Sequence, residues 1–103
     1  MTAANPQAFL NGVDVMVTLH LVYHGLSNEL STLEVCSMLS IQFRREVDRQ
    51  KLRLRTEDYA ALQAHFFQWA YDLYRAQVQA HGKEKLAKFL ETDLQQPFEA
   101  LLA

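Results

Sequence analysis

The longest uninterrupted helical pattern in the chain reads EDYAALQAHFFQWAYDLYRAQVQAH and runs from Glu57 to His81. Its large apolar residues recur at steps of three and four, which is the period of an amphipathic α-helix and not of a strand. Thr56 precedes the stretch as a predicted N-terminal cap, and Gly82 follows it, where a helix commonly ends. These signals predict one long helix and place the chain among α-helical proteins.

This helix carries more aromatic surface than a single buried face requires. One stripe, which contains Phe66, Trp69 and Leu73, is predicted to face the core. A second stripe lies beside the first and is predicted to bind a partner; its members are Phe67, Tyr71, Tyr74 and Val78. Aromatic side chains bury a large area at low entropic cost and dominate the energetics of many protein interfaces. The alternative is that both stripes belong to the core.

The clearest helix start lies upstream, where Ser31 and Glu34 form an S-x-x-E capping box. Leucines, valines and other apolar residues follow at three- and four-residue steps as far as Val47. The helical pattern can continue to about Leu54. We therefore predict a second long helix that begins at the capping box.

The N-terminal part of the chain is predicted to form one helix that starts at Asn5-Pro6 and is closed by Gly25. Within it, residues 13–23 alternate apolar and polar side chains as a half-buried strand would. No second strand-like segment accompanies them, so a helix is favoured, and a β-ribbon formed by two copies is the alternative. The stretch is apolar nearly all round, and three of its residues are predicted to bind a partner or a second copy: Val15, Leu19 and Val22.

A last helix is predicted from Lys83, and Pro97 either kinks it or opens a short terminal turn. The composition agrees with helices, because half of the residues are hydrophobic while only 3 Gly and 2 Pro interrupt the chain. The length suits one domain over residues 1–103. The sequence therefore predicts an all-α fold, a compact bundle of four or five helices that forms a homodimer.

Six of the ten cationic residues cluster between Arg44 and Arg55, although the formal net charge is −2. The candidate electrostatic patch consists of Arg44, Arg45, Arg49 and Arg53. One interpretation is a solvated helix end whose cations complement the macrodipole and pair with nearby acidic residues. The alternatives are that the patch binds an acidic protein or nucleic acid. Nucleic acid is disfavoured because no recognition pattern between two helices accompanies the patch.

Two features could carry chemistry, and neither completes a catalytic or metal motif. His20 and His24 are four residues apart, a spacing that places two imidazoles on one helix face, where they can hold a transition metal. Two ligands do not complete a site, and such pairs are common by chance. Cys36 lies in an apolar sequence, where burial would raise its pKa and leave it unreactive. We therefore expect no enzymatic activity, no metal and no cofactor.

The single cysteine excludes an intramolecular disulfide and is typical of a reducing compartment, so we expect a cytoplasmic protein. Residues 1–7 provide no cationic segment ahead of an apolar stretch, so no signal peptide is expected. The apolar run at residues 13–23 is about half as long as a bilayer-spanning helix and contains Asp14 and His20. We expect no membrane association.

The excess of apolar surface lies in the segments Phe66–Tyr74 and Val13–Tyr23. A small helical chain of this kind resembles bacterial regulators that occupy another protein's interface, and it is closest in size and character to antiactivators of LuxR-type quorum-sensing transcription factors. Anti-CRISPR proteins and toxin-neutralising immunity proteins are similar in the same way. The resemblance implies stoichiometric inhibition that blocks a regulator's dimerisation or its DNA contact. The alternatives are a nucleic-acid-associated protein that uses the candidate electrostatic patch, and a metal- or ligand-binding bundle that uses His20 and His24.

Overall fold

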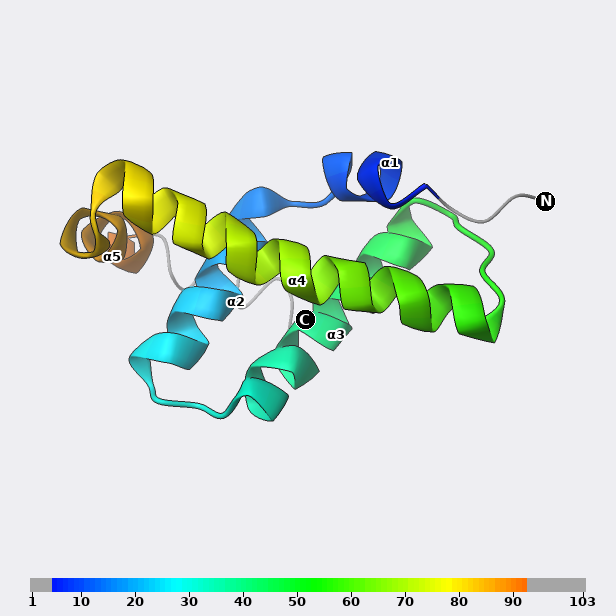
Figure 1. Cartoon of the computed structure of the whole chain (residues 1–103), viewed down its shortest axis with the longest axis horizontal. Helices are drawn as coiled ribbons and strands as arrows, with labels where there is room; N and C mark the ends of the chain where they lie inside the picture. The colour runs from blue at the N-terminus through cyan, green and yellow to red at the C-terminus, as the bar shows by residue number, and fades with distance from the viewer. Residues whose placement is uncertain (1–4, 93–103) are drawn as a thin grey trace.

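The computed structural model describes residues 5–92, which form five helices and no strand in that range. The helices are α1 (Pro6–Asn11), α2 (Val15–Ser27), α3 (Thr32–Arg49), α4 (Thr56–His81) and α5 (Lys83–Thr92). The longest helix, α4, runs along the long axis of the molecule and contacts each of the other four (Figure 1). The predicted all-α fold is confirmed, and the β-ribbon alternative for residues 13–23 is wrong.

The N-terminal part of the chain forms two helices, so the prediction of one helix is wrong. Asn5 caps α1 as predicted, because its side chain accepts hydrogen bonds from the backbone N–H groups of Gln7 and Ala8. Asp14 then starts a second helix, since its side chain accepts from the N–H of Met16 and of Val17 at 3.1 and 3.2 Å. An N-cap residue has an extended backbone, which interrupts the helix.

Gly25 lies inside α2, which ends at Ser27, so the prediction that Gly25 closes the first helix is also wrong. Gly25 is buried against α3, and a Cβ atom at this position would lie 2.3 Å from Cγ2 of Val35. The glycine is therefore required by the close approach of two helices and not by a turn.

The capping box is confirmed at the start of α3: Ser31 Oγ accepts from the Glu34 N–H at 3.1 Å, and Glu34 Oε1 accepts from the Ser31 N–H at 3.2 Å. The helix ends earlier than predicted, at Arg49, and Lys51 adopts a φ of +57°. A left-handed residue cannot continue a helix, so the pattern that extends to Leu54 is not helical throughout.

The long helix ends at Gly82 as predicted, with a φ of +85° at the glycine. Its start differs, because Arg55 is the N-cap, makes no side-chain capping bond, and leaves Thr56 as the first helical residue. The last helix begins at Lys83 as predicted. The predicted terminal turn at Pro97 lies outside the described residues.

The centre of the core is a cluster of three phenylalanine rings from three helices. Phe9 of α1, Phe43 of α3 and Phe66 of α4 are each at most 2% exposed. Their ring centroids are 5.3 Å apart for Phe9 and Phe43, 5.6 Å for Phe43 and Phe66, and 6.3 Å for Phe9 and Phe66. These spacings suit edge-to-face and tilted aromatic packing. The cluster therefore joins α1 to the two longest helices.

The buried row of α4 repeats every four residues and consists of Leu62, Phe66, Ala70 and Tyr74. Trp69 and Leu73, which the sequence predicts to be core beside Phe66, are only half-buried. The predicted division of α4 into a core stripe and a binding stripe is therefore wrong in detail, because Tyr74 lies on the buried row.

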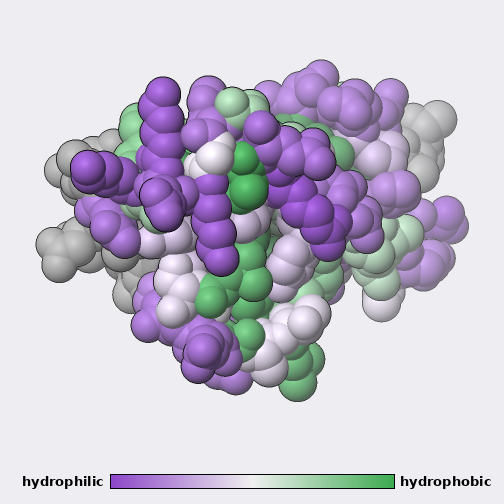
Figure 2. Space-filling view, turned by 60° about the vertical axis from the view of Figure 1, so that its left-hand side comes forward, coloured by the Kyte–Doolittle hydropathy of each residue, from purple (hydrophilic) through white to green (hydrophobic). Residues whose placement is uncertain are grey.

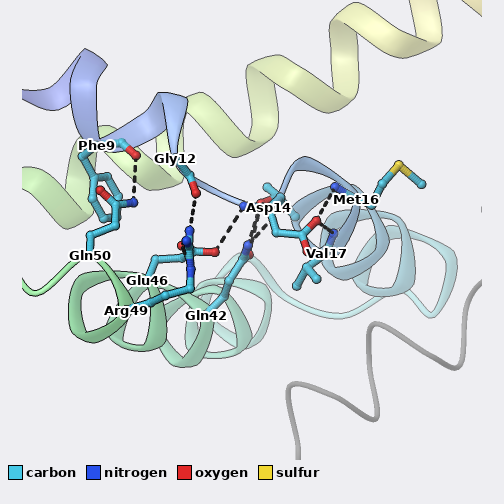
Figure 3. Close-up of polar contacts among 10 residues, drawn as sticks. Phe9, Gly12, Asp14, Met16, Val17, Gln42, Glu46, Arg49 and Gln50 are labelled. Atoms are coloured by element: carbon cyan, nitrogen blue, oxygen red, sulfur yellow. Dashed lines mark hydrogen bonds and ion pairs between the residues drawn. The ribbon is translucent and has the colours of Figure 1, made fainter.

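Four polar side chains, three on one face of α3 and one at its C-cap, hold the connection between α1 and α2 (Figure 3). We call them the α3 latch: Gln42, Glu46, Arg49 and Gln50. Gln42 Nε2 donates to the Asp14 carbonyl at 3.2 Å, and Glu46 Oε2 accepts from the Asp14 N–H at 3.2 Å. Gln50 Nε2 donates to the Phe9 carbonyl at 3.1 Å, and Arg49 donates both to Glu46 and to the Gly12 carbonyl. The latch therefore provides partners for the Asp14 N–H and the Gly12 carbonyl, and it adds a donor to the carbonyls of Phe9 and Asp14, which also accept backbone N–H groups.

Replacing Arg49 by Gln is expected to lower the free energy of unfolding by about 1 kcal/mol. Glu46 is a buried carboxylate, and it would lose its charged hydrogen-bond donor, as the Gly12 carbonyl would lose its donor. The matched control is Arg53→Gln, an exposed cation in the loop after α3, which should change the free energy by less than about 0.5 kcal/mol. Urea unfolding followed by circular dichroism measures both. Equal losses for the two variants would contradict a role for Arg49 in the latch.

Candidate protein-binding surface

Helices α2, α4 and α5 form two grooves near the end of the molecule that holds α5. The N-terminal groove has a volume of about 370 Å³ and lies along the first half of α2. The C-terminal groove has a volume of about 690 Å³ and lies along the second half of α2. Figure 2 turns the α5 end toward the viewer and shows a narrow band of apolar surface between hydrophilic flanks.

The N-terminal groove has an apolar floor and a polar rim that contains one lysine. Its apolar lining comes from α2 and α5: Val15, Met16, Leu19, Leu86 and Phe89. Val15 is 41% exposed and Phe89 is 54% exposed, although both are large apolar residues. His81 and Lys85 lie at the same groove and supply the polar rim. Such a surface suits apolar side chains that are flanked by anionic groups.

The C-terminal groove combines aromatic walls with charges of both signs. Tyr23 of α2 and Tyr74 of α4 line it together with Leu26, which is 47% exposed. The Tyr23 hydroxyl donates to Glu91 Oε1 at 2.7 Å, which ties α2 to α5 and raises the pKa of Tyr23. Burial raises the pKa of the Tyr74 hydroxyl. Tyr23 is half-buried whereas Tyr74 is only 7% exposed, so Tyr23 offers the larger aromatic surface to a partner.

Four of the seven residues predicted to bind a partner line these grooves. Val15 and Leu19 line the N-terminal groove, and Tyr74 and Val78 line the C-terminal groove. Val22 is fully buried in the core, so it offers no surface to a partner.

Phe67 and Tyr71 are half-buried and line neither groove. Burial raises the pKa of the Tyr71 hydroxyl, and the Cys36 thiol adds to the rise. Sequence reasoning missed Phe89 and Leu26 as groove residues. Phe89 could have been found, because it lies off the buried i, i+4 pair that Leu86 and Leu90 form on α5.

The residues of the candidate electrostatic patch differ in their surroundings. Arg49 belongs to the α3 latch and pairs with Glu46, one of the acidic residues considered for this helix end. Farther along the block, Arg55 pairs with Asp58 at 3.3 Å at the start of α4. The remaining members of the patch are exposed: Arg44, Arg45 and Arg53.

The residues considered for metal binding or nucleophilic chemistry lie apart from the grooves. His20 is fully buried in the core, whereas His24 is half-buried near the end of α2. Within residues 5–92, no group of three or more His, Cys, Asp or Glu side chains could hold a metal ion. Burial raises the pKa of the Cys36 thiol, as the apolar sequence around it predicts. The structure therefore adds no third ligand to the histidine pair.

The candidate binding surface therefore consists of the two grooves, whose exposed apolar side chains lie beside charged and polar residues. Across residues 5–92, no helix is both long and apolar enough to cross a membrane. Comparisons of the chain with protein-family models, with curated proteins and with solved structures found no match.

Proposed function

We propose that the protein is a non-enzymatic regulator that binds another protein stoichiometrically through the grooves of α2, α4 and α5. One observation carries the proposal: large apolar side chains that line the grooves remain exposed, with 41% exposure at Val15, 47% at Leu26 and 54% at Phe89. Scattered exposed apolar residues are ordinary, but sets that line concave surfaces with polar rims are typical of binding sites.

The chemistry of the rims indicates which kind of partner fits. His81 and Lys85 border the N-terminal groove, and Arg75 and Lys83 border the C-terminal groove. An amphipathic helix whose apolar residues enter the grooves and whose acidic residues face Lys85 and Lys83 would complement both surfaces, and a basic or neutral residue would face Glu29 in the C-terminal groove. Rim charges of this kind chiefly accelerate association and select the partner, while the apolar anchors determine how slowly the complex dissociates.

The most specific form of the proposal is an antiactivator that binds a LuxR-type transcription factor in the cytoplasm and blocks its dimerisation or DNA contact. Its support is the resemblance in size and helical character, together with the exposed apolar grooves. Inhibition by occupying an interface needs no cofactor and no turnover. The chain would act at a one-to-one ratio with its target.

The test uses charge insertion in the grooves. After affinity purification from the native host identifies a partner, we expect Leu26→Asp and Phe89→Asp each to weaken the purified complex at least tenfold, about 1.4 kcal/mol. The matched control is Ala80→Asp, an exposed α4 residue that lines neither groove, which should change the affinity less than about twofold. Isothermal titration supplies both affinity and stoichiometry. Groove variants that bind as tightly as wild type, or a complex without fixed stoichiometry, would overturn the proposal.

The antiactivator form has its own readout. A promoter reporter driven by a LuxR-type regulator should lose activity when the wild-type chain is co-expressed, and should recover it with Phe89→Asp. If co-expression of the wild-type chain leaves the reporter activity unchanged, LuxR-type regulators are rejected as the target. Protein binding itself would still stand if titration has shown a stoichiometric complex with another partner.

A further inference from the structure

The face of α3 that points away from the core carries an exposed apolar stripe. Leu33 is 77% exposed and Ile41 is 45% exposed, and Ser37 lies between them, four residues from each. Residues four apart share a helix face, so the three side chains form one continuous stripe. The buried residues of α3, such as Val35 and Leu39, lie on the opposite face. We call the three exposed side chains the α3 stripe.

Opposite charges flank the two ends of the α3 stripe. Glu34 is exposed beside Leu33 at the N-terminal end, and Arg44 and Arg45 are exposed one turn beyond Ile41 at the C-terminal end. The acidic end coincides with the positive pole of the helix and the basic end with its negative pole, so each end suits the helix macrodipole. A helix with this charge order is complementary to a copy of itself that runs in the opposite direction.

We propose that α3 pairs antiparallel with α3 of a second copy of this chain, across a two-fold axis close to Ser37. The pairing places Leu33 against Ile41 of the second copy, and it places the acidic end of each helix against the basic end of the other. Both contacts occur twice, as an isologous interface requires. A parallel arrangement would instead bring like charges together at each end.

Ser37 is suited to the centre of such a helix pair. Its hydroxyl donates to the Leu33 carbonyl of its own helix at 2.9 Å, so the polar group keeps its hydrogen bond when the surface is covered. Its small side chain also lets the two helices approach closely. A single helix pair buries less surface than a standard interface, so the dimer is expected to dissociate on dilution.

This surface is independent of the proposed partner-binding site. Both grooves are lined by residues of α2, α4 and α5 and by Glu29, and no α3 residue lines either of them. Dimerisation through α3 therefore leaves both grooves of each copy accessible. The sequence predicts a dimer through residues 13–23, but most of that surface is used inside the molecule, as the burial of Leu21 and Val22 shows.

The experiment is a charge exchange across the stripe, read by sedimentation equilibrium of the full chain. We expect wild type to associate reversibly from 11.9 kDa to twice that mass. Leu33→Glu or Ile41→Lys alone should weaken association at least tenfold, because each places a charge against an apolar residue of the second copy. The double variant should recover most of the loss, because each introduced Glu then faces an introduced Lys of the other copy.

Both substituted residues are exposed, so melting curves by circular dichroism should show each variant folded. Ala80→Asp on α4 serves as the control and should associate as wild type does. Wild type that stays monomeric at sub-millimolar concentration, single variants that dimerise normally, or a double variant without recovery would each overturn the proposal. Partner titration is a separate measurement, so a monomeric chain that still binds its partner would reject this dimer and leave the proposed function standing.

Discussion

Phe66→Ala is expected to lower the free energy of unfolding by about 3 to 5 kcal/mol, a large part of the stability of a domain this size. Phe66 is fully buried, and its ring lies 5.6 Å from that of Phe43 and 6.3 Å from that of Phe9. Truncation would leave a cavity where α1, α3 and α4 meet, and the surrounding rings could fill it only partly. Thermal and urea unfolding measured by circular dichroism provide the readout.

The matched control for this prediction is Trp69→Ala, three residues along the same helix. Trp69 has a larger ring, whose centroid lies 5.9 Å from that of Phe66, but it is only half-buried. Part of its surface is already in contact with water, so we expect a smaller loss of about 1 to 2 kcal/mol. A loss from Trp69→Ala that equals or exceeds the loss from Phe66→Ala would show that the buried row of α4 is assigned to the wrong face.

The second large effect is expected at Gly25, where α2 packs closely against Val35 of α3. The Cβ of Gly25→Ala would lie 2.3 Å from Cγ2 of Val35, far inside van der Waals contact. Val35 is 1% exposed, and a β-branched side chain in a helix has one strongly preferred rotamer, so the helices themselves must separate. We expect a net loss of about 1 to 3 kcal/mol, even though Ala favours helix over Gly by about 1 kcal/mol.

A double-mutant cycle isolates this contact. Val35→Ala alone should be destabilising because it opens a cavity, but in the Gly25→Ala background it removes the clashing methyl groups. The double variant should therefore be more stable than the sum of the single losses predicts, by at least about 1 kcal/mol. Gly82→Ala is the control, because nothing lies within 4 Å of its added Cβ and its cost arises from a φ of +85°. Strict additivity of Gly25→Ala and Val35→Ala would contradict the close contact.

Local signals in the sequence predict much of the helical structure. The predictions that failed depend on contacts between residues far apart in the sequence. The capping box at Ser31 was predictable because both of its hydrogen bonds lie within four residues. The break at Asp14 was not, since the carboxylate also suits the polar face of a continuous helix. Its backbone N–H donates to Glu46 and its carbonyl accepts a further hydrogen bond from Gln42, and these partners are 32 and 28 residues away in the sequence. Only the folded arrangement shows that these donors and acceptors are available there.

The candidate surface was predicted only in part, because burial also depends on contacts between distant parts of the sequence. An apolar run such as residues 13–23 offers hydrophobic side chains in every direction, and neighbouring helices decide which of them are covered. Packing against α3 and α4 takes Val22 into the core and leaves Val15 at the rim of a groove. Arg49 was predicted to pair with nearby acidic residues such as Glu46, and it does, but its bond to the Gly12 carbonyl joins residues 37 apart in the sequence and has no local signal.

The α3 latch has a consequence for the order in which the chain acquires structure during synthesis. Helix α1 has only six residues, too few to be stable alone. The groups that hold it come from α3, and the hydrogen bond from Gln50 to Phe9 spans 41 residues of sequence. At a translation rate of roughly 5 to 20 residues per second, α1 leaves the ribosome seconds before Gln50 does. Helix α1 is therefore expected to settle only after α3 has emerged, and until then Phe9 lacks the ring of Phe43 against which it packs.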